Sequence, residues 1–269
     1  MTDRFRLDGR VAVVTGALGN LGPVWAEALL EAGATVIGLD LPHARPNAAF
    51  TTLQSTYQGK LTLIGANVTD RAALTAARDQ MLGTHDVPSV LVNNAGIDAP
   101  PAANGGGYRL EDIPFDVNQR IFEVNTLGLF QVTQLFGADM ARARRGSIIN
   151  IGSLYASVSP DARFYDHIVS DPPFLKPPAY GASKAAVVNL TKYFATAWGP
   201  FGVRVNTLSP GGVLGAQDDQ FKSKFNARVP LGRMAVHTDL IGPLQFLASD
   251  ASSYVTGAEL RVDGGFTAW

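Results

Sequence analysis

Short apolar runs rich in β-branched residues recur along the chain and predict seven β-strands. Most of them are apolar at consecutive positions, which is typical of strands covered by helices on both faces. The predicted strands are residues 11–15, 35–39, 61–64, 89–92, 146–151, 203–208 and 259–262.

Helical spacing of apolar residues fills most of the intervals between these runs. The predicted helices are roughly residues 20–32, 70–82, 115–143, 179–198 and 238–248. Strands that alternate with helices predict a parallel, doubly wound sheet, so the expected fold class is α/β and Rossmann-like. Because no linker or shift in composition interrupts the alternation, we expect one domain over residues 1–269.

Two irregular stretches break the rhythm, residues 98–107 and 156–178. Irregular segments of this length inside a compact domain are usually functional or disordered. We expect 156–178 to form a substrate lid beside the site, although a solvated lid or a subunit contact is an equally good interpretation. Its polar side chains could hydrogen-bond a polyhydroxylated substrate; they are Asp161, Arg163, Tyr165, Asp166 and His167.

Composition narrows the function classes. With 46% apolar residues, 17% charged residues and a formal net charge of −1, the chain has neither the bias of a disordered protein nor a basic footprint for nucleic acid. No run approaches the ~18 apolar residues of a membrane span. The absence of cysteine excludes disulfides, thiolate metal sites and cysteine nucleophiles. Because the sequence shows neither a membrane span nor a signal-peptide pattern before the first strand, we expect a cytoplasmic protein. The four scattered histidines predict no metal site.

A glycine-rich turn joins the first strand to the first helix, in Thr15-Gly-Ala-Leu-Gly-Asn-Leu-Gly22. Glycines at 16, 19 and 22 allow a tight turn and a close approach to a pyrophosphate, which the helix N-terminus then attracts. The alternative is a turn needed only for packing. Within a strand–turn–helix unit the pattern favours dinucleotide binding, with contacts from Gly16, Gly19, Asn20, Leu21 and Gly22.

The ends of the next strands add further candidate contacts. Asp40 closes the second strand, where a carboxylate accepts hydrogen bonds from ribose hydroxyls and repels a 2′-phosphate, which favours NAD over NADP. The alternative is a solvated strand-end carboxylate. We expect Asn67 and Val68 beside the adenine, and Asn94, Ala95 and Gly96 close to the cofactor.

Tyr180 and Lys184 stand four residues apart at the start of a helical pattern, which puts them on one face. A phenol has a pKa near ~10, and a neighbouring ammonium stabilises the phenolate and should lower that pKa toward the working pH. Such a spacing is common by chance. Its weight comes from Ser153 after the fifth strand and Asn125 in the long helix before it.

In this order, the motifs resemble those of the short-chain dehydrogenases/reductases over nearly the whole chain. The motifs are Thr15-Gly…Gly22, Asn93-Asn-Ala-Gly96, Asn125, Ser153, Tyr180-x-x-x-Lys184, Pro210-Gly211 and Val262-Asp-Gly-Gly265. The resemblance implies that Tyr180 transfers the proton, Lys184 binds the nicotinamide ribose, Ser153 positions the substrate and Asn125 holds a relay water. It also implies cofactor contacts from Pro210, Gly211 and Val213, and a symmetric dimer or tetramer formed through helices 115–143 and 179–198; of these we expect a homotetramer.

The chain departs from the family pattern at four places. Asn20 stands where the commonest loop has its second glycine, Asn67 where Asp is frequent, and Gly215 near the usual Thr. The segment between Ser153 and Tyr180 is longer than usual. This longer segment resembles that of a bacterial branch that acts in surface-sugar and flagellin-glycan pathways. The resemblance includes Ile97-Asp98, Phe136-Gly-Ala-Asp-Met140, Leu154-Tyr155, Ser209-Pro-Gly-Gly-Val213 and Pro230-Leu-Gly-Arg-Met-Ala235. We therefore expect a sugar or sugar-derived acid as substrate; the alternatives are a lipid-like alcohol or a non-catalytic NAD-binding regulator.

Overall fold

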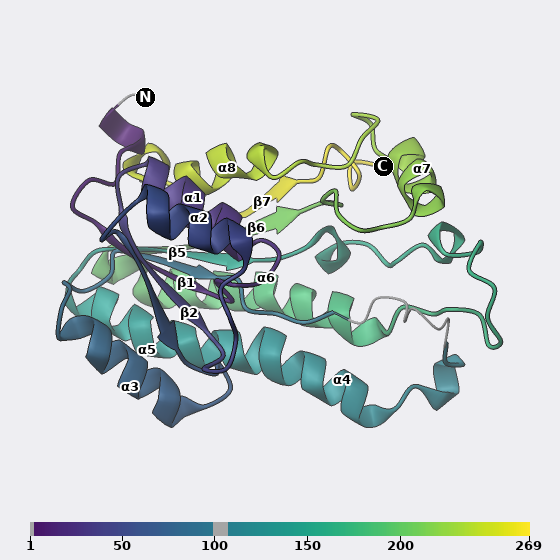
Figure 1. The fold of residues 1–269 in the computed structure, drawn as a ribbon, viewed down its shortest axis with the longest axis horizontal. Helices are drawn as coiled ribbons and strands as arrows, with labels where there is room; N and C mark the ends of the chain where they lie inside the picture. Colours follow the sequence, from purple (N-terminus) through teal and green to yellow (C-terminus); the bar gives the residue numbers. More distant parts are fainter. Residues whose placement is uncertain (1–2, 99–106) are drawn as a thin grey trace.

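Seven parallel strands form one sheet in the computed structural model, which describes residues 3–98 and 107–269 (Figure 1). The spatial order is β3-β2-β1-β4-β5-β6-β7, so the direction of winding reverses between β1 and β4. The strands are β1 (Val11–Thr15), β2 (Thr35–Asp40), β3 (Leu61–Gly65), β4 (Val90–Asn93), β5 (Gly146–Ile151), β6 (Val203–Pro210) and β7 (Glu259–Val262). The predicted α/β fold with a single doubly wound sheet is confirmed.

Eight α-helices connect and cover the strands in the described part of the chain. They are α1 (Gly22–Glu31), α2 (Ala48–Thr56), α3 (Arg71–Leu82), α4 (Phe115–Phe122), α5 (Leu129–Arg142), α6 (Pro178–Trp198), α7 (Asp219–Arg228) and α8 (Thr238–Ala248). The sequence prediction missed α2 and α7, which are short and largely polar. It also treated 115–143 as one helix, whereas a π-helical segment, Glu123–Gly128, separates α4 from α5.

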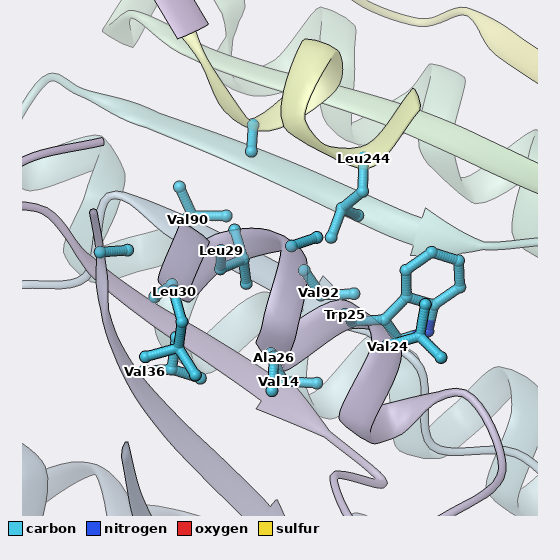
Figure 2. Packing of buried hydrophobic residues seen from close by; sticks show 14 of the residues in the cluster. Val14, Val24, Trp25, Ala26, Leu29, Leu30, Val36, Val90, Val92 and Leu244 are labelled. Atoms are coloured by element: carbon cyan, nitrogen blue, oxygen red, sulfur yellow. The ribbon is translucent and has the colours of Figure 1, made fainter. Parts of the chain in front are cut away.

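Neighbouring strand residues point to opposite faces and build two cores. On one face, Val14 and Val92 pack against Trp25 and Leu29 of α1 and Leu244 of α8 (Figure 2). Each of these side chains is almost wholly excluded from water, which is the main source of stability at this layer. The consecutive apolar positions read from the sequence thus correspond to two buried faces.

The second core lies on the opposite face of the sheet, under α3, α5 and α6. Val13 and Leu91 contribute from the strands and Phe136 and Phe194 from the helices. Between these two layers the carboxyl ends of β1, β4 and β5 meet at one edge, where parallel sheets bind ligands.

A third, smaller cluster lies outside the sheet. It joins the 156–178 segment to α7 and the C-terminal segment through Phe164, Tyr165, Phe225 and Phe266, with Leu154, Val229 and Met234 completing it. This packing gives the 156–178 segment its own apolar support. The predicted loop 98–107 lies, apart from its two ends, outside the described residues.

Candidate active site

A cavity of about 1080 Å³ opens along the carboxyl ends of the strands, from the end of β2 to the start of α6. Most of the residues that the sequence predicted for the site line it. They are Gly16, Gly19, Asn20, Leu21, Asp40, Asn67, Val68, Asn94, Ala95, Gly96, Ser153, Tyr180, Lys184, Pro210, Gly211 and Val213. Gly22 and Asn125 do not line this cavity, and both residues are buried.

The glycine turn is shaped by its own backbone. Gly16 adopts φ +62°, and a Cβ on it would lie 2.8 Å from Cα of Ala95. A Cβ on Gly22 would lie 2.4 Å from the carbonyl oxygens of Gly16 and Ala17. Only glycine fits these two positions without a shift of the main chain, because both contacts are with backbone atoms. The turn is therefore a tight cradle at the start of α1, as pyrophosphate binding requires.

Asn94 fixes this cradle from the neighbouring strand. Its Nδ2 donates to the carbonyl oxygens of Thr15 and Gly16, over 3.1 and 2.9 Å. Its Oδ1 accepts from Nε1 of Trp25 over 2.8 Å. The sequence predicted Asn94 as a cofactor contact, and the structure shows that its side chain is engaged in holding the glycine turn.

Asp40 lies at the far end of the cavity from Tyr180. Its Oδ2 accepts from the main-chain N–H of Leu18 over 2.8 Å, and its Oδ1 accepts from that of Leu41 over 2.8 Å. These two bonds hold the carboxylate between the glycine turn and the end of β2. Arg45 also lines the cavity near this end.

Asn125 occupies the π-helical segment and is almost fully buried. Its Oδ1 accepts from the N–H of Ile97 over 2.7 Å, and its Nδ2 donates to the carbonyl of Ile97 over 2.9 Å and to Oγ of Ser183 over 3.1 Å. Short π-helical turns occur frequently at functional sites. Here the turn ties α6 to the segment after β4.

Lys184 is buried and donates a hydrogen bond from Nζ to the carbonyl oxygen of Ile151, over 2.8 Å. Burial lowers its pKa to about 8, against the opposing charge of Asp98, which raises it. The ammonium is thus held one residue from the Gly152-Ser153 turn that follows β5.

Tyr180 lies one helical turn before Lys184, at the start of α6. Burial and the charge of Asp98 raise the pKa of Tyr180 to about 12, whereas a hydrogen bond with Ser153 lowers it. The sequence-based expectation that Lys184 would bring this pKa toward neutrality is not met in the protein alone. The Nζ of Lys184 lies 5.8 Å from the centroid of the Tyr180 ring, and burial is the largest cause of the raised pKa of Tyr180.

Sequence reasoning misplaced several side chains of the 156–178 segment. Asp161, Arg163 and Asp166 line a second cavity beside the C-terminal Trp269, away from Tyr180. Tyr165 is connected to the candidate site through Tyr155. It packs in the third cluster and hydrogen-bonds Tyr155, whose ring centroid lies 6.4 Å from that of Tyr180.

Asp98 and Lys176, which the sequence analysis did not predict as site residues, both lie at the Tyr180 end of the cavity. The Nζ of Lys176 is 2.6 Å from Oδ2 of Asp98 and 5.1 Å from the centroid of the Tyr180 ring. No residue pattern marks either one, because they are 78 positions apart and stand outside the predicted helices and strands. In residues 3–98 and 107–269, no three histidine, aspartate or glutamate side chains lie close enough together to hold a metal ion.

Comparison with known proteins identifies the family. The family model described as enoyl-(acyl carrier protein) reductase matches residues 16–267. The galactitol 2-dehydrogenase (L-tagatose-forming) of Cereibacter sphaeroides is 35% identical, over 98% of each chain. The D-arabinitol 2-dehydrogenase (ribulose-forming) of Scheffersomyces stipitis is 33% identical, over 98% of this chain and 96% of its own.

Solved structures give the same result. A short-chain dehydrogenase of Leptospira borgpetersenii with bound NAD⁺ is similar at 30% identity and a TM-score of 0.84, over 97% of this chain and 94% of its own. A gluconate 5-dehydrogenase of Burkholderia cenocepacia, in complex with NADP and tartrate, is similar at 30% identity and a TM-score of 0.83, over 99% and 98%. The chain belongs to the short-chain dehydrogenase/reductase family.

The family is one of oxidoreductases, and the named relatives act on the CH–OH groups of polyols or sugar acids. Of the two solved neighbours, one binds NAD⁺ and the other NADP, so membership alone does not select the cofactor. Every helix in residues 3–98 and 107–269 is too short or too polar to cross a lipid bilayer.

Proposed function

We propose that the protein is an NAD-dependent dehydrogenase that interconverts a secondary alcohol and a ketone on a polyol or a sugar-derived acid. One observation carries the proposal: Ser153, Tyr180 and Lys184 converge at the end of a cavity that begins at the glycine turn and Asp40. A proton-transfer group and a dinucleotide cradle on one continuous wall are what hydride transfer from an alcohol requires.

The residues around the cavity suit a dinucleotide. Gly16 and Gly22 leave no room for a side chain in the turn, and a Cβ on Gly96 would come within 3.2 Å of Oδ1 of Asn125. The nicotinamide, when bound, accepts or supplies the hydride. The glycine turn and Asp40 would hold the adenosine diphosphate half, and Lys184 the nicotinamide ribose.

Proton transfer is assigned to Tyr180. In alcohol oxidation, its phenol oxygen removes the hydroxyl proton as the carbon–hydrogen bond breaks, and in ketone reduction it returns that proton. Ser153 orients the carbonyl or hydroxyl through its Oγ, which already meets Tyr180. Lys184 supplies the positive charge that favours the phenolate. Asn125 belongs to the proposed proton relay, through its position between Ile97 and Ser183.

NAD is the proposed cofactor because the Asp40 carboxylate lines the cavity at the end of β2, where it would repel a 2′-phosphate. Asp40 is fixed by two main-chain hydrogen bonds, so it cannot swing aside without breaking them. The exposed Arg45 is the competing feature, since a guanidinium could pair with a 2′-phosphate. We expect the repulsion from Asp40 to have the larger effect on cofactor choice, because two hydrogen bonds fix the Asp40 carboxylate.

The substrate class, the assembly and the location of the protein are also part of the proposal. The named relatives act on polyols and sugar acids, which favours those compounds over the surface glycans suggested by the sequence. We also propose a cytoplasmic homotetramer and a lid role for residues 156–178. A non-catalytic regulator would have no use for Tyr180 beside Ser153, and the charged pair Asp98–Lys176 disfavours a lipid-like alcohol.

The test is a substrate screen with the purified chain. Pentitols, hexitols, tetritols and the matching aldonic acids are each offered with NAD⁺ and with NADP⁺, and reduced cofactor is followed by its near-ultraviolet absorbance. We expect turnover within this set, with NAD⁺ preferred. Tight NAD⁺ binding without turnover of any of them would support the regulatory alternative instead, and turnover of long-chain alcohols alone would support the lipid-like one.

A further inference from the structure

An ion pair joins the 156–178 segment to the loop after β4. Lys176 stands two residues before α6, and its Nζ lies 2.6 Å from Oδ2 of Asp98, two residues after Gly96. The Lys176 side chain is only 7% exposed, whereas that of Asp98 is 35% exposed. The ammonium is therefore buried behind the carboxylate, and the carboxylate is the partner that meets solvent.

This pair lies against the candidate acid/base. The Nζ of Lys176 is 5.1 Å from the centroid of the Tyr180 ring and 5.4 Å from that of Tyr155, so two aromatic rings hold it as well as Asp98. Asp98 lines the same cavity as Tyr180 and Ser153, and Lys176 is not part of that lining. The charge of Asp98 is close enough to raise the pKa values of both Tyr180 and Lys184.

The arrangement decides which charge a substrate meets. A sugar acid needs a cation that faces the cavity. Lys176 is covered by Asp98 and by the two rings, and Lys184, which lines the cavity, already donates to the carbonyl oxygen of Ile151. An incoming carboxylate would meet the carboxylate of Asp98 first, and like charges at short range in a partly buried site repel. A neutral polyol meets an acceptor instead, since ionised carboxylates accept several hydrogen bonds each and polyol hydroxyls donate them.

We propose that Asp98, oriented by Lys176, is the specificity-determining residue that selects a neutral polyol over a sugar acid. Asp98 accepts a hydrogen bond from a hydroxyl next to the carbinol that reacts at Tyr180. Lys176 is a positioning residue that holds the carboxylate, through the ion pair, toward the cavity. The inference rests on the proposed dehydrogenase function and narrows its substrate class.

The experiment compares matched pairs that differ only at one terminal carbon, arabinitol with arabinonate and galactitol with galactonate. The readout is the ratio of kcat/KM for the polyol to that for the acid, each with NAD⁺ at one pH. Because Tyr180 serves both members of a pair, any change in its pKa cancels in this ratio. The wild-type ratio should favour the polyol.

Asp98→Asn keeps the shape of the side chain and removes its charge. We expect it to shift the ratio at least tenfold toward the acid. Asp112→Asn, an exposed carboxylate nearby in the chain, is the matched control and should leave the ratio unchanged. In case an unpaired Lys176 disturbs folding, Asp98→Asn combined with Lys176→Met removes both charges and should show the same shift.

The outcomes distinguish failure of the role assigned to Asp98 from failure of the proposed dehydrogenase function. A wild-type enzyme that prefers the acids, or an unchanged ratio in both Asp98 variants, overturns the role of Asp98 and leaves the proposed dehydrogenase intact. Loss of acid turnover in Lys176→Gln, with polyol turnover kept, would make Lys176 the ligand of the substrate and also overturn the inference. Wild-type protein that oxidises neither class overturns the proposed function itself.

Discussion

Lys184 donates its Nζ proton to the carbonyl oxygen of Ile151 over 2.8 Å, from α6 to the last residue of β5. The bond places a buried cation against the strand whose next turn carries Ser153. Nζ also lies 3.6 Å from where a Cβ on Gly96 would stand, which places it beside the segment that follows β4. Lys184 thus connects the end of β5, the segment after β4 and the helix that bears Tyr180.

Replacing Lys184 by methionine tests both the chemistry and the energetics of this contact. We expect kcat/KM to fall by roughly 10²–10⁴, as for loss of an acid–base component, and NAD⁺ to bind more weakly because the ribose contact is lost. The chemical loss is measured by steady-state kinetics and the affinity by calorimetry. Unchanged NAD⁺ affinity would contradict the ribose assignment.

The same variant gives a stability prediction with a defined sign. Burial lowers the pKa of Lys184 from 10.5 to about 8, so the folded state disfavours the charged form. Between pH 8 and 10.5 the unfolded chain holds more protons than the folded one, and the wild-type free energy of unfolding gains from this group as pH rises. The difference in the free energy of unfolding between Lys184→Met and wild type, measured by chemical unfolding, should therefore favour the variant at pH 7. This advantage should shrink as the pH rises toward 10.

Tyr180→Phe removes one oxygen and little volume. We expect the fold and NAD⁺ binding to survive while the chemical step falls by roughly 10²–10⁴. A deuterium isotope effect on the reacting carbon establishes that hydride transfer limits the measured rate. If the variant keeps a near-normal rate under that condition, another group is the base.

The sheet could be predicted from the sequence because each strand is apolar on both faces, as Val13 and Val14 show by pointing into different cores. Helix α7 could not, because Phe221 and Phe225 are its main apolar residues and face a local cluster outside the sheet. The π-helical segment at Asn125 leaves no trace in the pattern, because apolar spacing runs through it. Asp98 and Lys176 could not be predicted as site residues, because only the folded chain brings them together.

We expect cofactor preference to depend on Asp40. We expect kcat/KM for NAD⁺ to exceed that for NADP⁺ by at least tenfold, which is about 1.4 kcal/mol. Asp40→Ser should narrow this ratio, since it removes the charge that repels the 2′-phosphate. Arg45→Ala is the informative companion: if it lowers NADP⁺ use without altering NAD⁺ use, Arg45 is the residue that admits the phosphate. Equal efficiency with both cofactors in the wild-type protein would refute the assignment.

Assembly can be tested at the surface of α6. Ala182 and Ala185 are exposed there, and small side chains allow two helices to approach closely. Leu127, in the π-helical segment, is 56% exposed as well. We expect light scattering to give the mass of a homotetramer at micromolar concentration, and Ala185→Glu to dissociate it because it would bury an unpaired charge. Ser55→Glu on the exposed face of α2 should leave the mass unchanged, and a monomeric wild type would contradict the prediction.

Removal of the Asp98 charge should also move the pH dependence of alcohol oxidation. Tyr180 is faced by Asp98, Ser153, Tyr155, Lys176 and Lys184, and among these the negative charge of Asp98 raises its pKa while the bond to Ser153 lowers it. Oxidation needs the phenolate, so its rate rises with pH through the pKa of Tyr180. Asp98→Asn takes away the opposing charge, and this change favours the phenolate. The rising limb of log kcat/KM for a polyol should therefore shift to lower pH, while Asp112→Asn keeps the wild-type limb. A shift to higher pH would mean that Asp98 acts on Tyr180 through packing rather than through its charge.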